Sequence, residues 1–188
     1  MLSILRKIYS FLIDTLQSLL IAAAVFLIIY QFIMRPFEVK GDSMVPNFEN
    51  NEYVLTNIAS LHLKAPQLGD VIVFKAPREP QKSFIKRVIG TPDDTISIRN
   101  GNLILNGNVL NENEYLPTNL KTSPGSFIDE GGVMTVPSDS YFVLGDNRNF
   151  SQDSREWGFV KRDLVTGYSF FVYWPVSKMR LIENPYKN

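Results

Sequence analysis

Cysteine is absent from the 188 residues, and His62 is the only histidine. Without thiols the chain can hold no disulfide, thiolate zinc site or iron–sulfur cluster, and it can use no cysteine nucleophile. A Ser-His-Asp triad would have to use His62, and a lone histidine between two leucines is far more often structural than catalytic. We therefore expect the base of any acyl-transfer chemistry to be a different residue.

An excess of charge of either sign is also missing, because 19 basic residues balance 19 acidic ones. The sequence contains no run of like charge, so there is no electrostatic reason to expect a nucleic-acid partner. With 45% apolar and 20% charged residues, the composition is that of an ordinary globular protein with room for one domain of middling size.

One long apolar run is present near the amino terminus. It extends from Leu16 to Met34, contains no Pro or Gly, and is interrupted only by Gln17, Ser18 and Gln31. A helix rising about 1.5 Å per residue over this run comes close to the roughly 30 Å of a hydrocarbon core. The preceding residues 2–13 are also largely apolar, so the helix can begin early. We predict one membrane span.

A cleaved signal peptide is the competing interpretation. Arg6 and Lys7 precede the run, and Ala22-Ala23-Ala24 is typical of a cleavage site. The run continues for ten residues beyond this site, which favours a retained anchor. The basic residues before the span favour a cytoplasmic amino terminus.

Beyond Pro36 the sequence changes to short β-rich segments separated by Gly, Asn, Asp and Pro. Strands are predicted at residues 53–56, 71–75, 84–89, 95–98, 103–105, 132–136, 141–144 and 168–174. Asn100-Gly101 and Asn106-Gly107 supply the positive φ angles of tight turns, so residues 95–110 are expected to form a small meander. This pattern predicts an antiparallel β domain. Residues 111–129 are polar and contain prolines, which indicates a long, partly mobile excursion.

Directly after the apolar run, residues 41–46 read Gly-Asp-Ser-Met-Val-Pro. Such a turn would present the Ser43 hydroxyl at a strand edge. From this segment alone, a juxtamembrane linker with a turn serine is the preferred interpretation. Ser43 follows Met34 by nine residues, so even an extended chain holds it within roughly 30 Å of the end of the span.

In the predicted strand at residues 84–89, Lys86 and Arg87 point to opposite faces, so one cation lies among apolar neighbours whichever face is inward. The default interpretation is an edge strand with outward-reaching cations. Alternatively Lys86 is desolvated, and lowering its pKa by about three units takes roughly 4 kcal/mol, which burial can supply. Ser83 and Lys86 also match the Ser-x-x-Lys signature of penicillin-recognising acyl transferases, but that signature needs a helix, so we regard the match as coincidental.

Residues 145–158 read Gly-Asp-Asn-Arg-Asn-Phe-Ser-Gln-Asp-Ser-Arg-Glu-Trp-Gly. Turn-forming residues make a solvated loop the plain interpretation. The functional interpretation is a cross-linked loop under a site, in which Ser151 offers a hydroxyl that can hold the lone pair of a neutral lysine in line. The charges available for cross-linking balance one another and are Asp146, Arg148, Asp153 and Arg155.

Together these segments resemble the type I signal peptidases, the membrane-bound leader peptidases of bacteria. Residues 41–46 look like the nucleophile motif of that family, and residues 69–74 with 85–90 look like its general-base motif. Residues 145–158 are similar to its Gly-Asp-Asn-Arg…Ser…Asp-Ser-Arg-x-Trp-Gly signature. The motifs occur in the order found in the family, and the single span resembles its shorter, one-anchor members.

The resemblance implies that Ser43 is the nucleophile, Lys86 is the base and Ser151 orients the lysine amine. It implies structural ion pairs between Arg87 and Asp146 and between Asp153 and Arg155. The implied substrate pocket consists of Phe37, Val39, Met44, Phe48, Phe84 and Ile85.

Two departures from the family pattern occur. Some members carry a serine two residues before the nucleophile as an oxyanion donor, whereas this chain has Gly41, which leaves the backbone N–H of Ser43. Pro46 is followed by Asn47 where the family usually has threonine, which we regard as minor.

The implied fold is mainly β: an antiparallel catalytic domain of the signal-peptidase/LexA-like kind preceded by one transmembrane helix. Residues 1–35 would form a cytoplasmic stub and anchor, and residues 36–188 an extracytoplasmic peptidase domain in which 91–140 are an inserted hairpin or cap region. The implied activity is removal of signal peptides from secretory preproteins after Ala-x-Ala-like sites, in contact with the lipid bilayer and without cofactor, metal or nucleic acid.

Two other classes of function stay open at this point. A membrane-tethered β domain with only a binding or scaffold role would share the anchor and the strands. A Ser-x-x-Lys acyl transferase would depend on Ser83 in place of Ser43.

Overall fold

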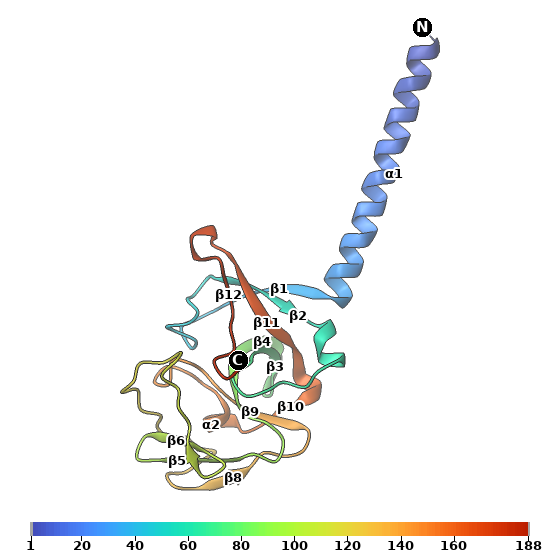
Figure 1. Cartoon of the computed structure of the whole chain (residues 1–188). Coiled ribbons are helices and arrows are strands. Elements are labelled where there is room, and N and C mark those ends of the chain that lie inside the picture. Colours follow the sequence, from blue (N-terminus) through green and yellow to red (C-terminus); the bar gives the residue numbers. More distant parts are fainter. Residues whose placement is uncertain (1, 188) are drawn as a thin grey trace.

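The computed structural model describes residues 2–187, without the side chains of Leu2 and His62. The long helix α1 (Leu2–Phe32) extends away from a β-rich body, as Figure 1 shows. Residues Ser3–Phe32 are long and apolar enough to cross a membrane, and none of the most apolar window is buried by the rest of the chain. An apolar surface of this size is unfavourable in water and suits the hydrocarbon core of a membrane.

The helix ends two residues earlier than the apolar run does. Strand β1 (Met34–Glu38) begins almost at once, so Met34 belongs to the sheet. Pro36 explains the change, because proline cannot continue a helix and disfavours the helical conformation of the residue before it. The expected domain boundary between residues 35 and 36 consequently falls inside β1.

The main sheet has eight strands in the order β1-β2-β11-β3-β4-β9-β10, with β12 paired to β11, and its ladders are antiparallel. Besides β1, it contains β2 (Tyr53–Asn57), β3 (Val71–Ala76), β4 (Glu79–Gly90), β9 (Ser140–Leu144), β10 (Val160–Lys161), β11 (Val165–Trp174) and β12 (Arg180–Leu181). The short helices are η1 (Ala59–His62), α2 (Ser154–Trp157), η2 (Arg162–Leu164) and η3 (Val176–Lys178).

A second, four-stranded antiparallel sheet has the order β7-β6-β5-β8. It consists of β5 (Thr95–Arg99), β6 (Asn102–Leu105), β7 (Asn108–Val109) and β8 (Val133–Thr135), all within residues 91–140. Asn100 and Gly101 have φ angles of 51° and 74°, and Asn106 and Gly107 have 51° and 81°. The predicted meander with two tight turns is confirmed.

The mainly β, antiparallel fold with one apolar amino-terminal helix is confirmed, and each of the eight predicted strands coincides with an observed one. Four further strands, β1, β7, β10 and β12, were not predicted from the sequence. Three of these have only two residues, too few for an alternating pattern to be recognised, and β1 contains Arg35, Pro36 and Glu38, which leave no β-rich run.

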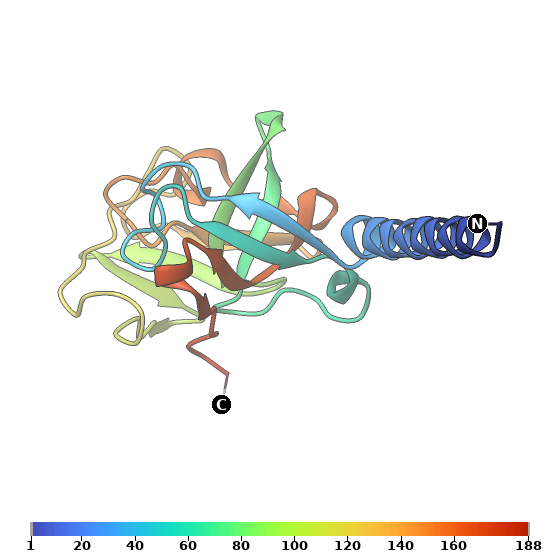
Figure 2. The same cartoon turned by 90° about the horizontal axis from the view of Figure 1, so that it is seen from above.

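Strand β4 contacts all three apolar cores of the β body. Val88 is buried with Phe74 and Tyr141 in one core, and Ile89 lies in a second with the smaller sheet. Ile85 packs against a third, which contains Met44 and Val172. A strand held on so many sides gives its polar side chains fixed positions. Seen from above in Figure 2, the β3–β4 hairpin (green) stands out from the body beside β1 (blue).

Candidate active site

Lys86 Nζ and Ser43 Oγ lie 2.6 Å apart and are hydrogen-bonded. Lys86 projects from the middle of β4, whereas Ser43 lies in the turn that follows β1. Asn147, in the 145–158 loop, fixes this turn. Its backbone N–H donates to the Ser43 carbonyl (3.1 Å), and its side-chain amide donates to the Asp42 carbonyl (3.0 Å). The hydroxyl and the amine are thus brought together by two well-supported elements.

The Lys86 side chain is only 4% exposed. Burial lowers its pKa from 10.5 to about 8, against the opposing influence of the carboxylates of Asp153 and Asp146. The desolvation of the ammonium outweighs the attraction of the two anions. With a pKa near 8, roughly one molecule in ten carries a neutral amine at pH 7. A proton acceptor is therefore available beside Ser43.

A cleft of about 770 Å³ opens next to this pair. Its walls come from β1, the Ser43 turn, the β3–β4 hairpin and the 145–158 loop. Among its apolar lining residues are four that were named for the substrate pocket: Phe37, Val39, Phe84 and Ile85. Phe150 and Gln152 also line the cleft and were not predicted.

Met44 and Phe48 do not line the cleft, in contrast to the expectation. They are 0% and 2% exposed and lie in the core with Val54, Val71 and Val172. The turn that directs Ser43 to the cleft sends the next side chain to the opposite side, into the interior. Sequence alone cannot tell a buried apolar residue from one that lines a cleft.

Ser151 lies close to Ser43 but makes no hydrogen bond to Lys86. Among the described residues, its buried Oγ has no hydrogen-bond partner. A Cβ atom at Gly145 would lie 2.2 Å from Ser151 Oγ and 2.4 Å from the Ser43 carbonyl oxygen. Only glycine permits this close approach of the two serines to the strand end.

The two ion pairs implied by the resemblance are present and buried. Arg87 contacts Asp146 with two parallel hydrogen bonds, Nε to Oδ1 at 2.9 Å and Nη2 to Oδ2 at 2.7 Å. Arg155 contacts Asp153 in the same way, at 2.8 and 2.9 Å. Asp153 Oδ2 also accepts from the Gly145 N–H (3.1 Å). These charges join β4 and the 145–158 loop in fixed geometry.

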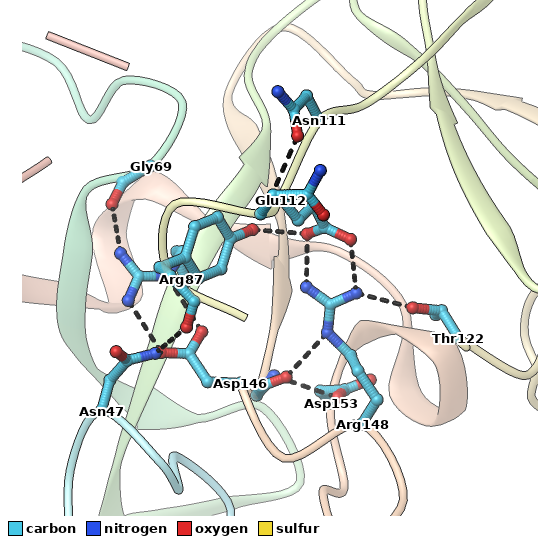
Figure 3. A network of polar contacts seen from close by, with 12 residues as sticks. Asn47, Gly69, Arg87, Asn111, Glu112, Thr122, Asp146, Arg148 and Asp153 are labelled. Atoms are coloured by element: carbon cyan, nitrogen blue, oxygen red, sulfur yellow. Dashed lines mark hydrogen bonds and ion pairs between the residues drawn. The ribbon is translucent and has the colours of Figure 1, made fainter. Parts of the chain in front are cut away.

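Residues outside the quoted motifs complete this network, which is drawn in Figure 3. The Asn47 amide donates both to Asp146 Oδ2 (2.8 Å) and to the Tyr115 carbonyl (2.9 Å). Glu112 forms an ion pair with Arg148. The sequence gives no motif that would indicate a role for Glu112 or Tyr115, because their partners are distant along the chain.

An antiparallel β domain with a serine hydroxyl beside a buried lysine amine has the arrangement of a serine hydrolase that works without histidine. The sequence model of the family described as "Signal peptidase, peptidase S26" matches residues 12–174. The chain belongs to this family. It is a serine peptidase, and its apolar helix α1 fits the membrane anchoring of such enzymes.

Two relatives that are at least 33% identical agree with this assignment. Signal peptidase IB of Staphylococcus aureus (strain MRSA252) is 33% identical over 185 residues, which cover 93% of this chain and 95% of that protein. Signal peptidase I of Leptolyngbya laminosa is 35% identical over 176 residues, covering 89% and 82%. The crystal structure of a signal peptidase I from Enterococcus faecalis V583 matches with 36% identity over 56% of this chain and 97% of that one, with a TM-score of 0.46.

Proposed function

We propose that this chain removes signal peptides from secretory preproteins by cutting after Ala-x-Ala-like sites with a Ser43/Lys86 dyad. Family membership supports the removal of signal peptides. The observation that carries the catalytic assignment is the 2.6 Å contact between a serine hydroxyl and a lysine amine whose pKa is lowered by burial.

In the first half-reaction, the neutral Lys86 amine takes the proton of the Ser43 hydroxyl while Ser43 Oγ attacks the scissile carbonyl. The tetrahedral intermediate collapses when the Lys86 ammonium gives this proton to the leaving amine, which departs as the new amino terminus of the mature protein. The signal peptide stays attached to Ser43 as an ester.

In the second half-reaction, Lys86 is again neutral and takes a proton from a water molecule as the water attacks the ester carbonyl. The proton then passes to Ser43 Oγ, and the signal peptide leaves with a free carboxyl group, which releases its proton to solvent. The same amine thus serves as base and acid in both halves.

For the oxyanion, we assign the backbone N–H of Ser43 as donor, since Gly41 has no side chain to contribute. The two hydrogen bonds from Asn147 to the Asp42 and Ser43 carbonyls fix the peptide planes of this turn. A donor whose direction is set before the substrate arrives stabilises developing charge without reorganisation.

The apolar side chains of Phe37, Val39, Phe84 and Ile85 provide the pocket surface in this proposal. Small residues such as alanine suit shallow pockets with aromatic walls because larger side chains would displace the scissile bond from Ser43. We also assign Ser151 to orient the Lys86 amine. The Ser151 hydroxyl is buried and has no hydrogen-bond partner among the described residues. A hydrogen bond to the Lys86 amine would remove the free-energy cost of leaving this hydroxyl unpaired, which supports the assignment.

We further propose that residues 36–188 form the extracytoplasmic peptidase domain, with 91–140 as its inserted cap region, and that the amino terminus is cytoplasmic. Ser43 follows the end of α1 by eleven residues, so the chain allows at most about 40 Å between them. This tether keeps the site near the membrane in which signal peptides lie and raises their effective concentration. Protease digestion of sealed, right-side-out vesicles should degrade the β body.

The dyad is tested by labelling the detergent-solubilised full chain with a serine-reactive acylating probe and mapping the modified residue. We expect Ser43 to be labelled, with loss of preprotein cleavage in proportion to labelling. Modification of Ser83 would instead favour the acyl transferase. An unlabelled protein that still supports secretion when Ser43 is replaced by alanine would favour the scaffold role.

A further inference from the structure

Residues 111–129 contain no helix or strand, but they are fastened to the loop that supports the site. Leu116, Thr122 and Ile128 in this segment are buried. Arg155 Nη1 donates to the Ser123 carbonyl (3.2 Å), and the Phe127 N–H donates to the Arg155 carbonyl (2.8 Å). We call residues 111–129 the strap because they are hydrogen-bonded to the 145–158 loop at several points.

The firmest charged contact of the strap is made by Glu112. Its carboxylate accepts two parallel hydrogen bonds from Arg148, at 2.9 Å from Nη1 and 2.5 Å from Nη2. The Arg148 side chain is 1% exposed and Glu112 is 15% exposed. Figure 3 shows Glu112 facing the end of the guanidinium, with Thr122 beside it. Two planar groups in this arrangement fix each other in orientation as well as in distance.

Arg148 connects Glu112 to the backbone that lies beside Ser43. Its Nε donates to the Gly145 carbonyl at 3.0 Å, so the guanidinium joins Glu112 on one side to the loop backbone on the other. Gly145 is the residue against which Ser151 and the Ser43 carbonyl are packed. A displacement of Arg148 therefore displaces the surface on which both serines rest.

A second set of contacts leads from Glu112 to the base strand. The Tyr115 hydroxyl donates to Glu112, and the Tyr115 ring lies 4.2 Å from the guanidinium carbon of Arg87. Arg87 is next to Lys86 on β4 and pairs with Asp146. Glu112 is thus placed where contacts to the nucleophile side and to the base side of the site meet.

We infer that Glu112 is a positioning residue for the peptidase reaction: through Arg148 it holds the backbone at Gly145 in the place that aligns Ser43 with Lys86. This inference rests on the proposed dyad. Glu112→Gln keeps the size of the side chain but leaves the buried Arg148 guanidinium without a counter-charge, so Arg148 seeks other acceptors and Gly145 moves with it. A shift of about 1 Å at reacting groups lowers rates by about 100-fold.

The test measures cleavage of a purified preprotein by the full chain in detergent. The concentration of active enzyme is determined for each variant by titration with an acylating inhibitor that labels Ser43. We expect E112Q to lower kcat per titrated site by about 10- to 100-fold with little change in KM. E112D keeps the charge and should recover part of the loss. A role confined to stability would reduce the number of titrated sites and leave kcat per site unchanged.

Glu114→Gln is the matched control, since Glu114 is an exposed carboxylate two residues further along the strap. It should match the unchanged enzyme. If E112Q yields too little folded protein, E112Q combined with R148Q removes the uncompensated cation. The double variant should then have a kcat per site no lower than that of R148Q alone, because Glu112 acts through Arg148.

Three outcomes overturn the inference: an unchanged kcat per site in E112Q, a loss in E112Q that E112D does not lessen, or a double variant much slower than R148Q. Failure of the proposed dyad is recognised separately, because Ser43→Ala would then retain cleavage.

Discussion

Arg87 and Asp146 form a buried two-pronged ion pair that joins the strand carrying Lys86 to the loop beneath Ser43. The side chains are 3% and 0% exposed. Arg87 also donates from Nη1 to the Gly69 carbonyl (3.0 Å), so the guanidinium fixes three separate parts of the chain. Neither group contacts the Ser43 hydroxyl, so the pair fixes the geometry around it, while the Asp146 carboxylate also acts to raise the pKa of Lys86.

Replacing Asp146 by asparagine should destabilise the β body by about 3–5 kcal/mol, because it leaves the buried Arg87 cation without a partner. Urea unfolding of the detergent-solubilised chain, followed by tryptophan fluorescence, measures this change. Asp129→Asn is the control, since Asp129 is exposed, and it should fall within about 0.5 kcal/mol of the unchanged protein. Equal stability of the two variants would contradict a structural role for the pair.

Ser43→Ala and Lys86→Met should each abolish nearly all preprotein cleavage. In the proposed mechanism the nucleophile and the base act as one unit, so the double variant should be hardly slower than either single one. Single-turnover cleavage of a preprotein is the measurement. Ser83→Ala should remain active, and substantial cleavage by Lys86→Met would mean that another group is the base.

The rate of cleavage should increase with pH through a pKa of about 8, the value to which burial lowers Lys86. Lys86 must be neutral to accept a proton, so activity is lost as pH falls below this value. A pH profile of kcat/KM over pH 5 to 10 in constant ionic strength tests this. An optimum on the acidic side of neutrality would point to a carboxylate base.

Lys86→Met should also stabilise the fold. The folded pKa of Lys86 lies near 8 and the ordinary value is 10.5, so the unfolded chain binds more protons between these pH values. The buried lysine therefore costs about 3 kcal/mol below pH 8, and this cost shrinks as pH rises toward 10.5. Unfolding free energies at pH 7 and pH 10 should show a gain for Lys86→Met that is smaller at the higher pH. Lys75→Met, at an exposed position on β3, should show no such pH-dependent gain.

Gly145→Ala should lower kcat by about 100-fold, because the added methyl group would meet the Ser43 carbonyl oxygen at 2.4 Å and must move the nucleophile turn. Gly132→Ala offers a control of the same chemistry, with its closest contact at 3.2 Å and no positive φ. Cleavage assays normalised to titrated sites compare the two. Similar rates for both variants would show that the turn at Ser43 can shift without consequence.

Local pattern in the sequence was sufficient for much of the fold. The apolar run predicts the long amino-terminal helix without any tertiary information. The eight predicted strands follow from runs of β-branched and aromatic residues between turn-forming residues. The turns at Asn100-Gly101 and Asn106-Gly107 follow from the conformational preference of two adjacent residues. Strand β1 was missed because Arg35, Pro36 and Glu38 leave no β-rich run, and only the pairing of Met34 to Glu38 with β2 identifies it as a strand.

The sequence by itself determined that neither cysteine nor a cluster of histidines can carry the chemistry, because the chain has no cysteine and one histidine. Its three motifs also indicated Ser43 and Lys86 as the candidate site residues. Tertiary structure decided where these groups lie and what surrounds them. It placed Met44 and Phe48 in the core, left Ser151 without a partner among the described residues, and brought Glu112 to Arg148 across 36 positions. The physical reason is that desolvation and ion pairing depend on which distant segments pack together, and no local pattern encodes the distance between two side chains.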